Sequence, residues 1–129
     1  MRSNGNTEVT SLRLHTDREG LGMILGPLEL AIMRALWEEG GRACTNKRVH
    51  LALTRSGLRL ALPTVATTMH RLTTKGLVLE HQQGKKVYTY KPAFTEEELE
   101  TFVVEHVLYR LRANWPAIMH SYDVGEMVQ

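Results

Sequence analysis

Threonine and arginine side chains are concentrated on one face of the segment from residue 63 to residue 76. A helix in this segment would begin at Pro63, whose missing N–H has no partner in a first turn. It would end at Gly76, which suits the left-handed backbone that follows many helices. The polar face has no acidic residue. Its threonine hydroxyls can bond to phosphates and base edges, and Arg71 can pair bidentately with guanine. The segment therefore has the chemistry of a helix that reads the major groove of DNA.

The opposite face of this segment is apolar and would anchor the helix in a core. Val65, Met69 and Leu72 recur at spacings of four and three residues, which places them on one side of a helix. An ordinary solvated surface helix has the same pattern, so the surroundings must decide between the two interpretations.

The chain carries its positive charge in one block around this segment. Residues 42–91 contain ten basic residues and one acidic residue, for a net charge of +9, whereas residues 1–41 carry −2 and residues 92–129 carry −5. A solvated surface usually mixes its signs, whereas a basic block marks the surface that meets a polyanion. The charge distribution therefore favours double-stranded DNA as the partner.

The length of 129 residues and the hydrophobic fraction of 43% fit one globular domain with an appendage. The single cysteine, Cys44, excludes an internal disulfide and a cysteine-rich zinc site. No apolar run has membrane-spanning length, and the N-terminus lacks the pattern of a secretory signal. We therefore expect a cytoplasmic protein without a membrane partner.

Residues 1–22 are polar and show no clean periodicity, so we expect a flexible N-terminal arm. Met23 directly precedes the ordered pattern and is a second candidate for the native start. Alternatively, Arg2, Arg13 and Arg18 would let the arm touch DNA, as arms do in some regulators.

Three helices are expected between this arm and residue 77. The first opens at Pro27 and ends at the glycine pair 40–41, and the second has Thr45 as its N-cap. The third is the 63–76 segment itself. Three helices in this order, the last of them flanked by basic residues, form a helix-turn-helix arrangement.

A β-hairpin is expected directly after the third helix. Residues 77–81 and 86–91 have strand patterns, and residues 82–85 form a turn between them. A hairpin in this place is a wing, and Lys85 and Lys86 at its tip could contact phosphates. Lysines at a hairpin tip can also serve solubility and edge protection, but the basic block favours the phosphate role.

Two acid-flanked apolar helices are expected after the hairpin. The first starts after Thr95 and runs to about Asn114, and the second starts at Pro116. Such helices after a complete domain need a surface to cover, and a second copy of the chain would supply it. They could also fold back on their own domain.

Together these elements predict a mainly α protein with a small β-hairpin, of the α+β class. A winged helix-turn-helix DNA-binding domain spans residues 23–92, and a helical dimerisation region spans residues 93–129. The predicted DNA-binding residues are Thr45, Lys47, Arg48, Pro63, Thr64, Thr67, Thr68, Arg71, Lys75, Lys85, Lys86 and Tyr88. The predicted dimerisation residues are Leu99, Phe102, Val103, His106, Val107, Leu111, Trp115, Ile118, Met119 and Tyr122.

The segments Leu25–Trp37, Thr64–Val78 and Val87–Pro92 resemble the BlaI/MecI/CopY family of bacterial repressors, over about residues 24–112. The resemblance implies a homodimeric repressor that binds a palindromic operator with its reading helix 63–75 and its wing 77–91. Thr64, Thr67 and Arg71 match positions of the family's reading helix, and Lys85, Lys86 and Tyr88 match its wing. An inducer or a protease is a further partner that the resemblance implies.

The chain departs from the family's pattern at one position of the reading helix and in the C-terminal region through which the family receives its signals. Ala66 stands where penicillinase repressors have lysine, which predicts a different operator sequence. The C-terminal region has no cysteine pair of the copper-responsive kind, and residues 117–122 lack the Asn-Phe bond at which the β-lactam branch is cleaved.

Other classes of function fit the sequence less well. No nucleophile, phosphate-loop or metal motif is present, so we expect no enzyme activity and no cofactor. A metal- or ligand-responsive sensor of the same fold, and a winged-helix protein-interaction module, are the alternatives. Five of the six histidines, which a metal site would need, are scattered along the chain at His50, His70, His81, His106 and His120.

Overall fold

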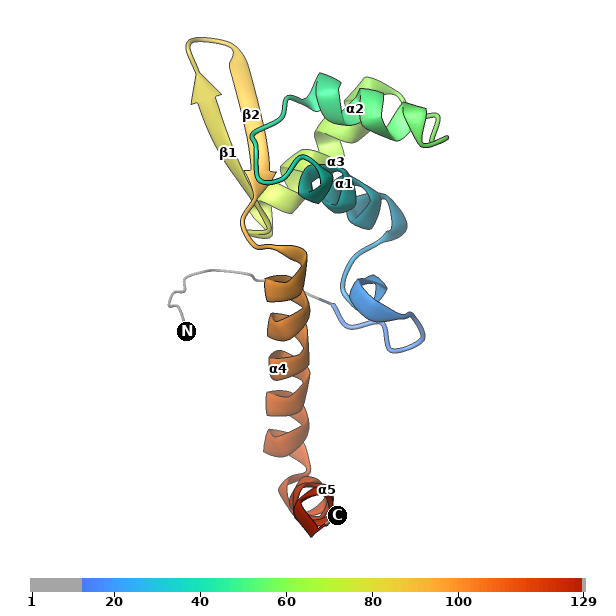
Figure 1. The fold of residues 1–129 in the computed structure, drawn as a ribbon, viewed down its shortest axis with the longest axis vertical. Helices are drawn as coiled ribbons and strands as arrows, with labels where there is room; N and C mark the ends of the chain where they lie inside the picture. Colours follow the sequence, from blue (N-terminus) through green and yellow to red (C-terminus); the bar gives the residue numbers. More distant parts are fainter. Residues whose placement is uncertain (1–12, 129) are drawn as a thin grey trace. The chain divides into compact units, whose positions relative to one another are not determined.

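The computed structural model describes the backbone of residues 13–128 and the side chains of residues 13–123 (Figure 1). In chain order the elements are a short 3₁₀ helix η1 (Gly20–Met23), α1 (Pro27–Glu38), α2 (Asn46–Arg55), α3 (Leu62–Thr74), β1 (Val78–Gln83), β2 (Val87–Pro92), α4 (Glu96–Asn114) and α5 (Pro116–Val128). The chain divides into two compact units, residues 1–96 and residues 97–129. The predicted fold, mainly helical with one β-hairpin in a winged-helix order, is confirmed.

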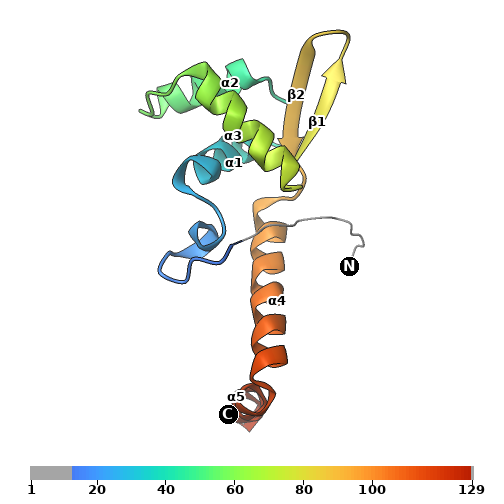
Figure 2. The same cartoon turned by 180° about the vertical axis from the view of Figure 1, so that it is seen from behind.

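The first unit is built on three helices that contact one another pairwise. The buried side chains come from the predicted apolar faces: Ile32, Met33 and Leu36 from α1, Val49 and Leu53 from α2, and Val65, Met69 and Leu72 from α3. Figure 2 shows α3 and the hairpin from behind, with the base of the hairpin beside the C-terminal end of α3. The core thus fixes the face of α3 that remains outside.

The ends of α3 follow the signals that the sequence gives. Pro63 lies in the first turn, one residue later than predicted, because Leu62 is the first helical residue. Gly76 has a φ of 84°, and the N–H of Leu77 donates to the carbonyl oxygen of Leu72 at 3.0 Å. This left-handed glycine ends the helix and turns the chain directly into β1.

The hairpin is antiparallel, with Val78 opposite Pro92 and Gln83 opposite Val87. We expected β2 to alternate between a packed and an exposed face. Instead Val87 and Tyr88 are both exposed, and Thr89 and Tyr90 are both buried. The tip extends past the helices, so both faces of β2 meet solvent there, whereas near the base Tyr90 pairs with Cys44 through two backbone hydrogen bonds of 2.8 Å.

Part of the predicted flexible arm is ordered, and for that part the prediction was wrong. Residues 16–18 form a turn and η1 follows, with Leu21 buried. The N–H of His15 donates to the carbonyl oxygen of Met23 at 2.6 Å and closes this loop. A single buried leucine and local backbone hydrogen bonds leave no periodic pattern in a sequence. The rest of the predicted arm, residues 1–12, lies outside the described residues.

We predict that the first unit loses stability at alkaline pH because of Cys44 and Tyr90, which join the loop before α2 to the hairpin. Burial raises the pKa of the Cys44 thiol above its usual 9.0 and that of the Tyr90 hydroxyl above its usual 10.0. Above about pH 9 the folded state therefore binds more protons than the unfolded chain, so the free energy of unfolding should fall as pH rises. Urea unfolding at about pH 8 and about pH 10 measures this difference. The variant Cys44→Ala should show a smaller difference, and an equal one would contradict the role of the thiol.

The second unit contains α5 and all but the first residue of α4. Arg112 and Asp123 form an ion pair of 3.4 Å between the two helices, and the Phe102 ring stacks on that of His106 with centroids 5.8 Å apart. Several large apolar side chains of this unit are exposed: Val104, Tyr109, Trp115, Ile118 and Tyr122.

Candidate nucleic-acid interface

One face of α3 is exposed and polar, as its anchoring requires. Val65, Met69 and Leu72 are fully buried, and this orientation leaves Thr64, Thr67 and Arg71 in solvent. These three are spaced by three and four residues, so their side chains form one stripe along the helix. Pro63 is also exposed, at the N-terminal end of the same helix. Among the described side chains no carboxylate pairs with Arg71, so its guanidinium is available to an anion.

Two predicted reading residues on α3 are engaged within the protein. Thr68 is only 3% exposed, and its hydroxyl donates to the carbonyl oxygen of Thr64 at 2.9 Å. The Nζ of Lys75 lies 2.7 Å from Oε2 of Glu29, a carboxylate with a side-chain exposure of 8%. Thr68 lies next to Met69 on the inward side, and Lys75 joins α3 to α1. We therefore leave both out of the DNA-facing stripe.

The remaining predicted DNA-binding residues that lie on a helix are at the start of α2. The Oγ1 of Thr45 accepts the N–H of Arg48 at 3.1 Å, which confirms Thr45 as the N-cap of α2. Lys47 and Arg48 are exposed. Arg48 also pairs with Glu39 at 3.1 Å, which raises its pKa. Because exposed ion pairs are weak, this contact leaves Arg48 able to exchange Glu39 for a phosphate.

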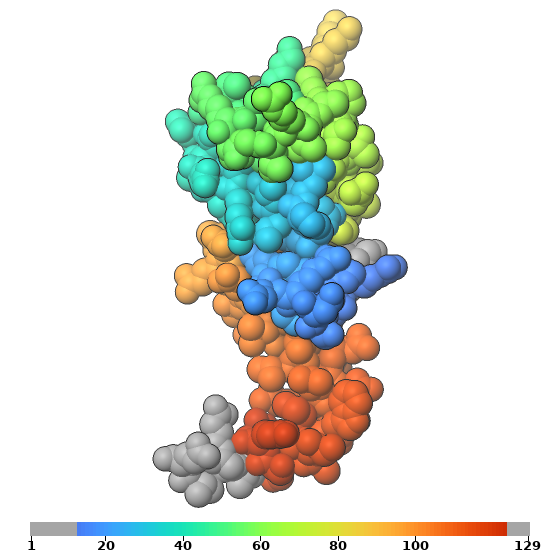
Figure 3. Space-filling model, turned by 90° about the vertical axis from the view of Figure 1, so that its right-hand side faces the viewer, coloured from blue at the N-terminus to red at the C-terminus, as the bar shows by residue number. Residues whose placement is uncertain are grey.

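The hairpin supplies the third group of candidate residues. Lys85 and Lys86 form the loop with Gly84, whose φ of 70° suits a tight turn, and Tyr88 follows on β2. All three side chains are exposed. Figure 3 shows the tip projecting beyond the helices of the first unit. Two ammonium groups on a projecting loop can reach a polyanion that lies against α3.

Two contacts that position these groups were missed by our sequence reasoning. Nε2 of His50 hydrogen-bonds to the carbonyl oxygen of Leu60 at 2.6 Å and holds the α2–α3 connection. Nε1–H of Trp37 donates to the carbonyl oxygen of Phe94 at 2.8 Å and secures the chain after β2. Each bond joins a side chain to a distant backbone atom, and no periodicity signals such a pairing.

The predicted dimerisation residues differ in how far they are exposed. Leu99 and Val103 are buried, Phe102, Val107, Leu111 and Met119 are half-buried, and His106, Trp115, Ile118 and Tyr122 are exposed. Val104 and Tyr109, which are not among the predicted dimerisation residues, are exposed as well.

Within the described part of the chain, no three side chains of His, Cys, Asp and Glu come together closely enough to hold a metal ion. No helix within residues 13–128 is long and apolar enough to cross a membrane.

Two solved structures resemble part of this chain. The ferric uptake regulator from Pseudomonas aeruginosa, solved with manganese, matches with a TM-score of 0.50 and 22% identity, over 57% of this chain and 55% of that one. This chain therefore spans about half the length of that regulator. The monomeric form of Bacillus licheniformis BlaI, in complex with the blaP half-operator, matches with a TM-score of 0.46 and 24% identity, over 57% of this chain and 85% of that one. A search of curated proteins finds no significant match.

The sequence itself assigns the family. The profile of the penicillinase repressor family matches residues 25–122, so the chain belongs to that family. The suspected resemblance is confirmed, and with it the expectation of a repressor rather than an enzyme.

Proposed function

We propose that this protein is a homodimeric transcriptional repressor that binds a palindromic operator in the cytoplasm. In this proposal the face of α3 with Thr64, Thr67 and Arg71 reads the major groove. Lys47 and Arg48 at the start of α2, and Lys85 and Lys86 on the wing, contact phosphates.

The observation that carries the proposal is the exposed hydroxyl and guanidinium stripe on α3, held outward by a buried face. It lies within the block of residues 42–91 that has a net charge of +9. A basic surface supplies the sequence-independent part of DNA affinity, and side chains in the groove supply the specificity.

The dimeric part of the proposal rests on the second unit. Its exposed apolar side chains include Trp115, directly before α5, and Ile118 and Tyr122 on α5. Large apolar side chains that a short helical unit leaves exposed favour a surface that meets another protein. A second copy is the economical occupant, because two-fold symmetry also gives two reading helices and a palindromic site.

The test is selection of bound sequences from random duplex DNA, followed by anisotropy titration of the selected duplex at several salt concentrations. We expect a two-fold-symmetric site with half-sites about one helical turn apart, and an affinity that falls steeply with salt. Unselective binding, or an affinity that salt does not change, would reject the proposal.

For the reading helix, we predict that Arg71→Ala relaxes base preference and weakens binding to the selected duplex by about 1–3 kcal/mol. The reason is the loss of a bidentate contact to a base. Repeating the selection with the variant measures the change, and Arg34→Ala, an exposed arginine on α1, is the matched control. If the variant selects the same site as the unchanged protein, Arg71 reads no base.

For the wing, we predict that the double change Lys85→Ala, Lys86→Ala weakens binding to all duplexes about equally. Removing two phosphate contacts should reduce the slope of log affinity against log salt by roughly two. Lys85→Arg with Lys86→Arg keeps both charges and should keep the slope. A loss confined to one base pair would show that the wing reads sequence instead.

A further inference from the structure

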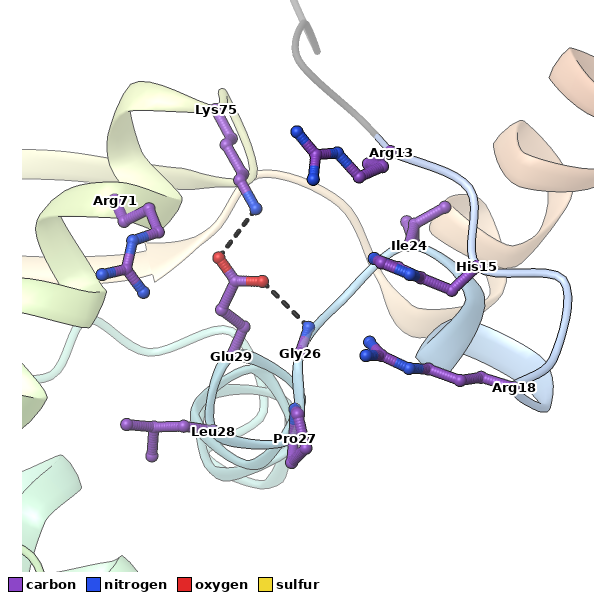
Figure 4. A pocket seen from close by; sticks show the side chains of 10 residues that line it. All are labelled: Arg13, His15, Arg18, Ile24, Gly26, Pro27, Leu28, Glu29, Arg71 and Lys75. Carbon is purple, nitrogen blue, oxygen red and sulfur yellow. Dashed lines mark hydrogen bonds and ion pairs between the residues drawn. The ribbon is translucent and has the colours of Figure 1, made fainter.

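A cavity of about 530 Å³ lies within the first unit, beside the C-terminal end of α3. Figure 4 shows side chains reaching toward it from the N-terminal segment on one side and from α3 on the other, with the start of α1 between them. Its volume lies within the range of small-molecule sites. The charged and titratable groups around it are Arg13, His15, Arg18, Glu29, Arg71 and Lys75.

The N-terminal segment is held in place at this cavity by backbone hydrogen bonds. The His15 N–H bonds to Met23, and the N–H of Arg18 donates to the carbonyl oxygen of His15 at 3.2 Å. Arg18 is therefore carried on a closed loop, and Arg13 lies two residues before the start of that loop at His15; both arginine side chains line the cavity.

The cavity has an excess of positive charge that its own carboxylate does not balance. Oε2 of Glu29 accepts Lys75 at 2.7 Å and Oε1 accepts the N–H of Gly26 at 3.0 Å, so both oxygens are engaged. Among the described side chains no carboxylate pairs with Arg13, Arg18 or Arg71. Four cationic groups and one carboxylate leave a formal charge of +3 around one cavity.

We propose that this cavity binds a small organic phosphate. Arginine presents planar pairs of N–H donors that match a phosphoryl group bidentately, so Arg13 and Arg18 would hold the anion. Ile24, Pro27 and Leu28 line the same cavity and offer an apolar wall to the rest of the ligand.

The shape and position of the cavity favour a free phosphate over the DNA backbone. Lys75 follows Thr64 by eleven residues, which places the cavity about 16 Å along the axis of α3 from the first reading residue. A hollow with an apolar wall suits a small molecule, whereas backbone phosphates need only projecting cations. Arg71 alone belongs to both surfaces, so ligand and DNA would compete for it, a step that rests on the proposed function.

The experiment is an NMR titration of the full ¹⁵N-labelled chain with phenyl phosphate at constant ionic strength, without DNA. We expect saturable shifts at the amides of Gly26, Leu28 and Glu29, and weaker binding of inorganic phosphate, which lacks the apolar part. Arg18→Ala should weaken phenyl phosphate binding at least tenfold, whereas the control Arg34→Ala should not change it.

Three results would overturn the proposal: no saturable shift, the same shifts with chloride at equal ionic strength, or unchanged affinity in Arg18→Ala. A titration with duplex DNA separates the two sources of phosphate. If Arg18→Ala weakens duplex binding while phenyl phosphate does not bind the unchanged protein, the arginines serve the DNA backbone and the proposal fails. Because the first titration contains no DNA, saturable phenyl phosphate binding supports the site even if duplex DNA does not bind.

Discussion

Replacing Ile118 by aspartate is expected to convert the proposed dimer into a monomer and to weaken operator binding at least about 100-fold. Ile118 is 56% exposed in the isolated chain, so the change should leave the fold of the protomer intact. At a two-fold interface the new carboxylate would be buried without a partner, which costs several kcal/mol. Two linked reading heads bind a palindrome far more tightly than one head, so separation alone accounts for a loss of about 10²–10⁴ in affinity.

Sedimentation equilibrium and anisotropy titration of the same preparations measure both effects of this change. His120→Asp is the matched control, because His120 is exposed and lies about 200° around the α5 helix from Ile118. It adds the same charge to the opposite face and should leave the dimer intact. Changes at Phe102 would be harder to interpret, since its ring is half-buried and stacks on His106 within α4. A dimer that persists in Ile118→Asp would place the interface away from the face that α5 exposes.

The parts of the fold that could be predicted from the sequence are those governed by local rules. Apolar spacing identified the buried face of α3, and Pro63 and Gly76 located its ends to within one residue. The block of positive charge around α3 follows directly from the number of basic and acidic residues in the sequence. These features are readable because each depends on residues that are neighbours along the chain.

The parts that could not be predicted depend on long-range contacts. Lys75 seemed free for DNA because its partner, Glu29, is 46 residues away in the sequence. Thr68 was included among the predicted DNA-binding residues, although its position beside Met69 turns it inward. Likewise, the backbone pairing of Cys44 with Tyr90 leaves no side-chain pattern. The cavity beside Arg18 exists only because the N-terminal loop closes on η1.

Removing the Glu29 side chain should test one of these long-range contacts, and we expect Glu29→Ala to lower the free energy of unfolding by about 2–3 kcal/mol. The change leaves the Lys75 ammonium without its counterion and the Gly26 N–H without its acceptor. Breaking a buried pair from one side commonly costs more, but the Lys75 side chain is 20% exposed and can turn partly to solvent. Urea unfolding followed by circular dichroism measures the loss, and Glu38→Ala, an exposed acid on the same helix, is the control.

The double change Glu29→Leu, Lys75→Met tests whether the loss in Glu29→Ala comes from the unpaired Lys75 ammonium. Both charges then disappear together, so no buried ion is left unpaired, and we expect most of the lost stability to return. If the double variant stays as unstable as Glu29→Ala, the main loss comes from the Gly26 N–H at the start of α1 rather than from Lys75. In that case Lys75 contributes little to holding α3 on α1, and its ammonium group could return to the set of candidate phosphate contacts.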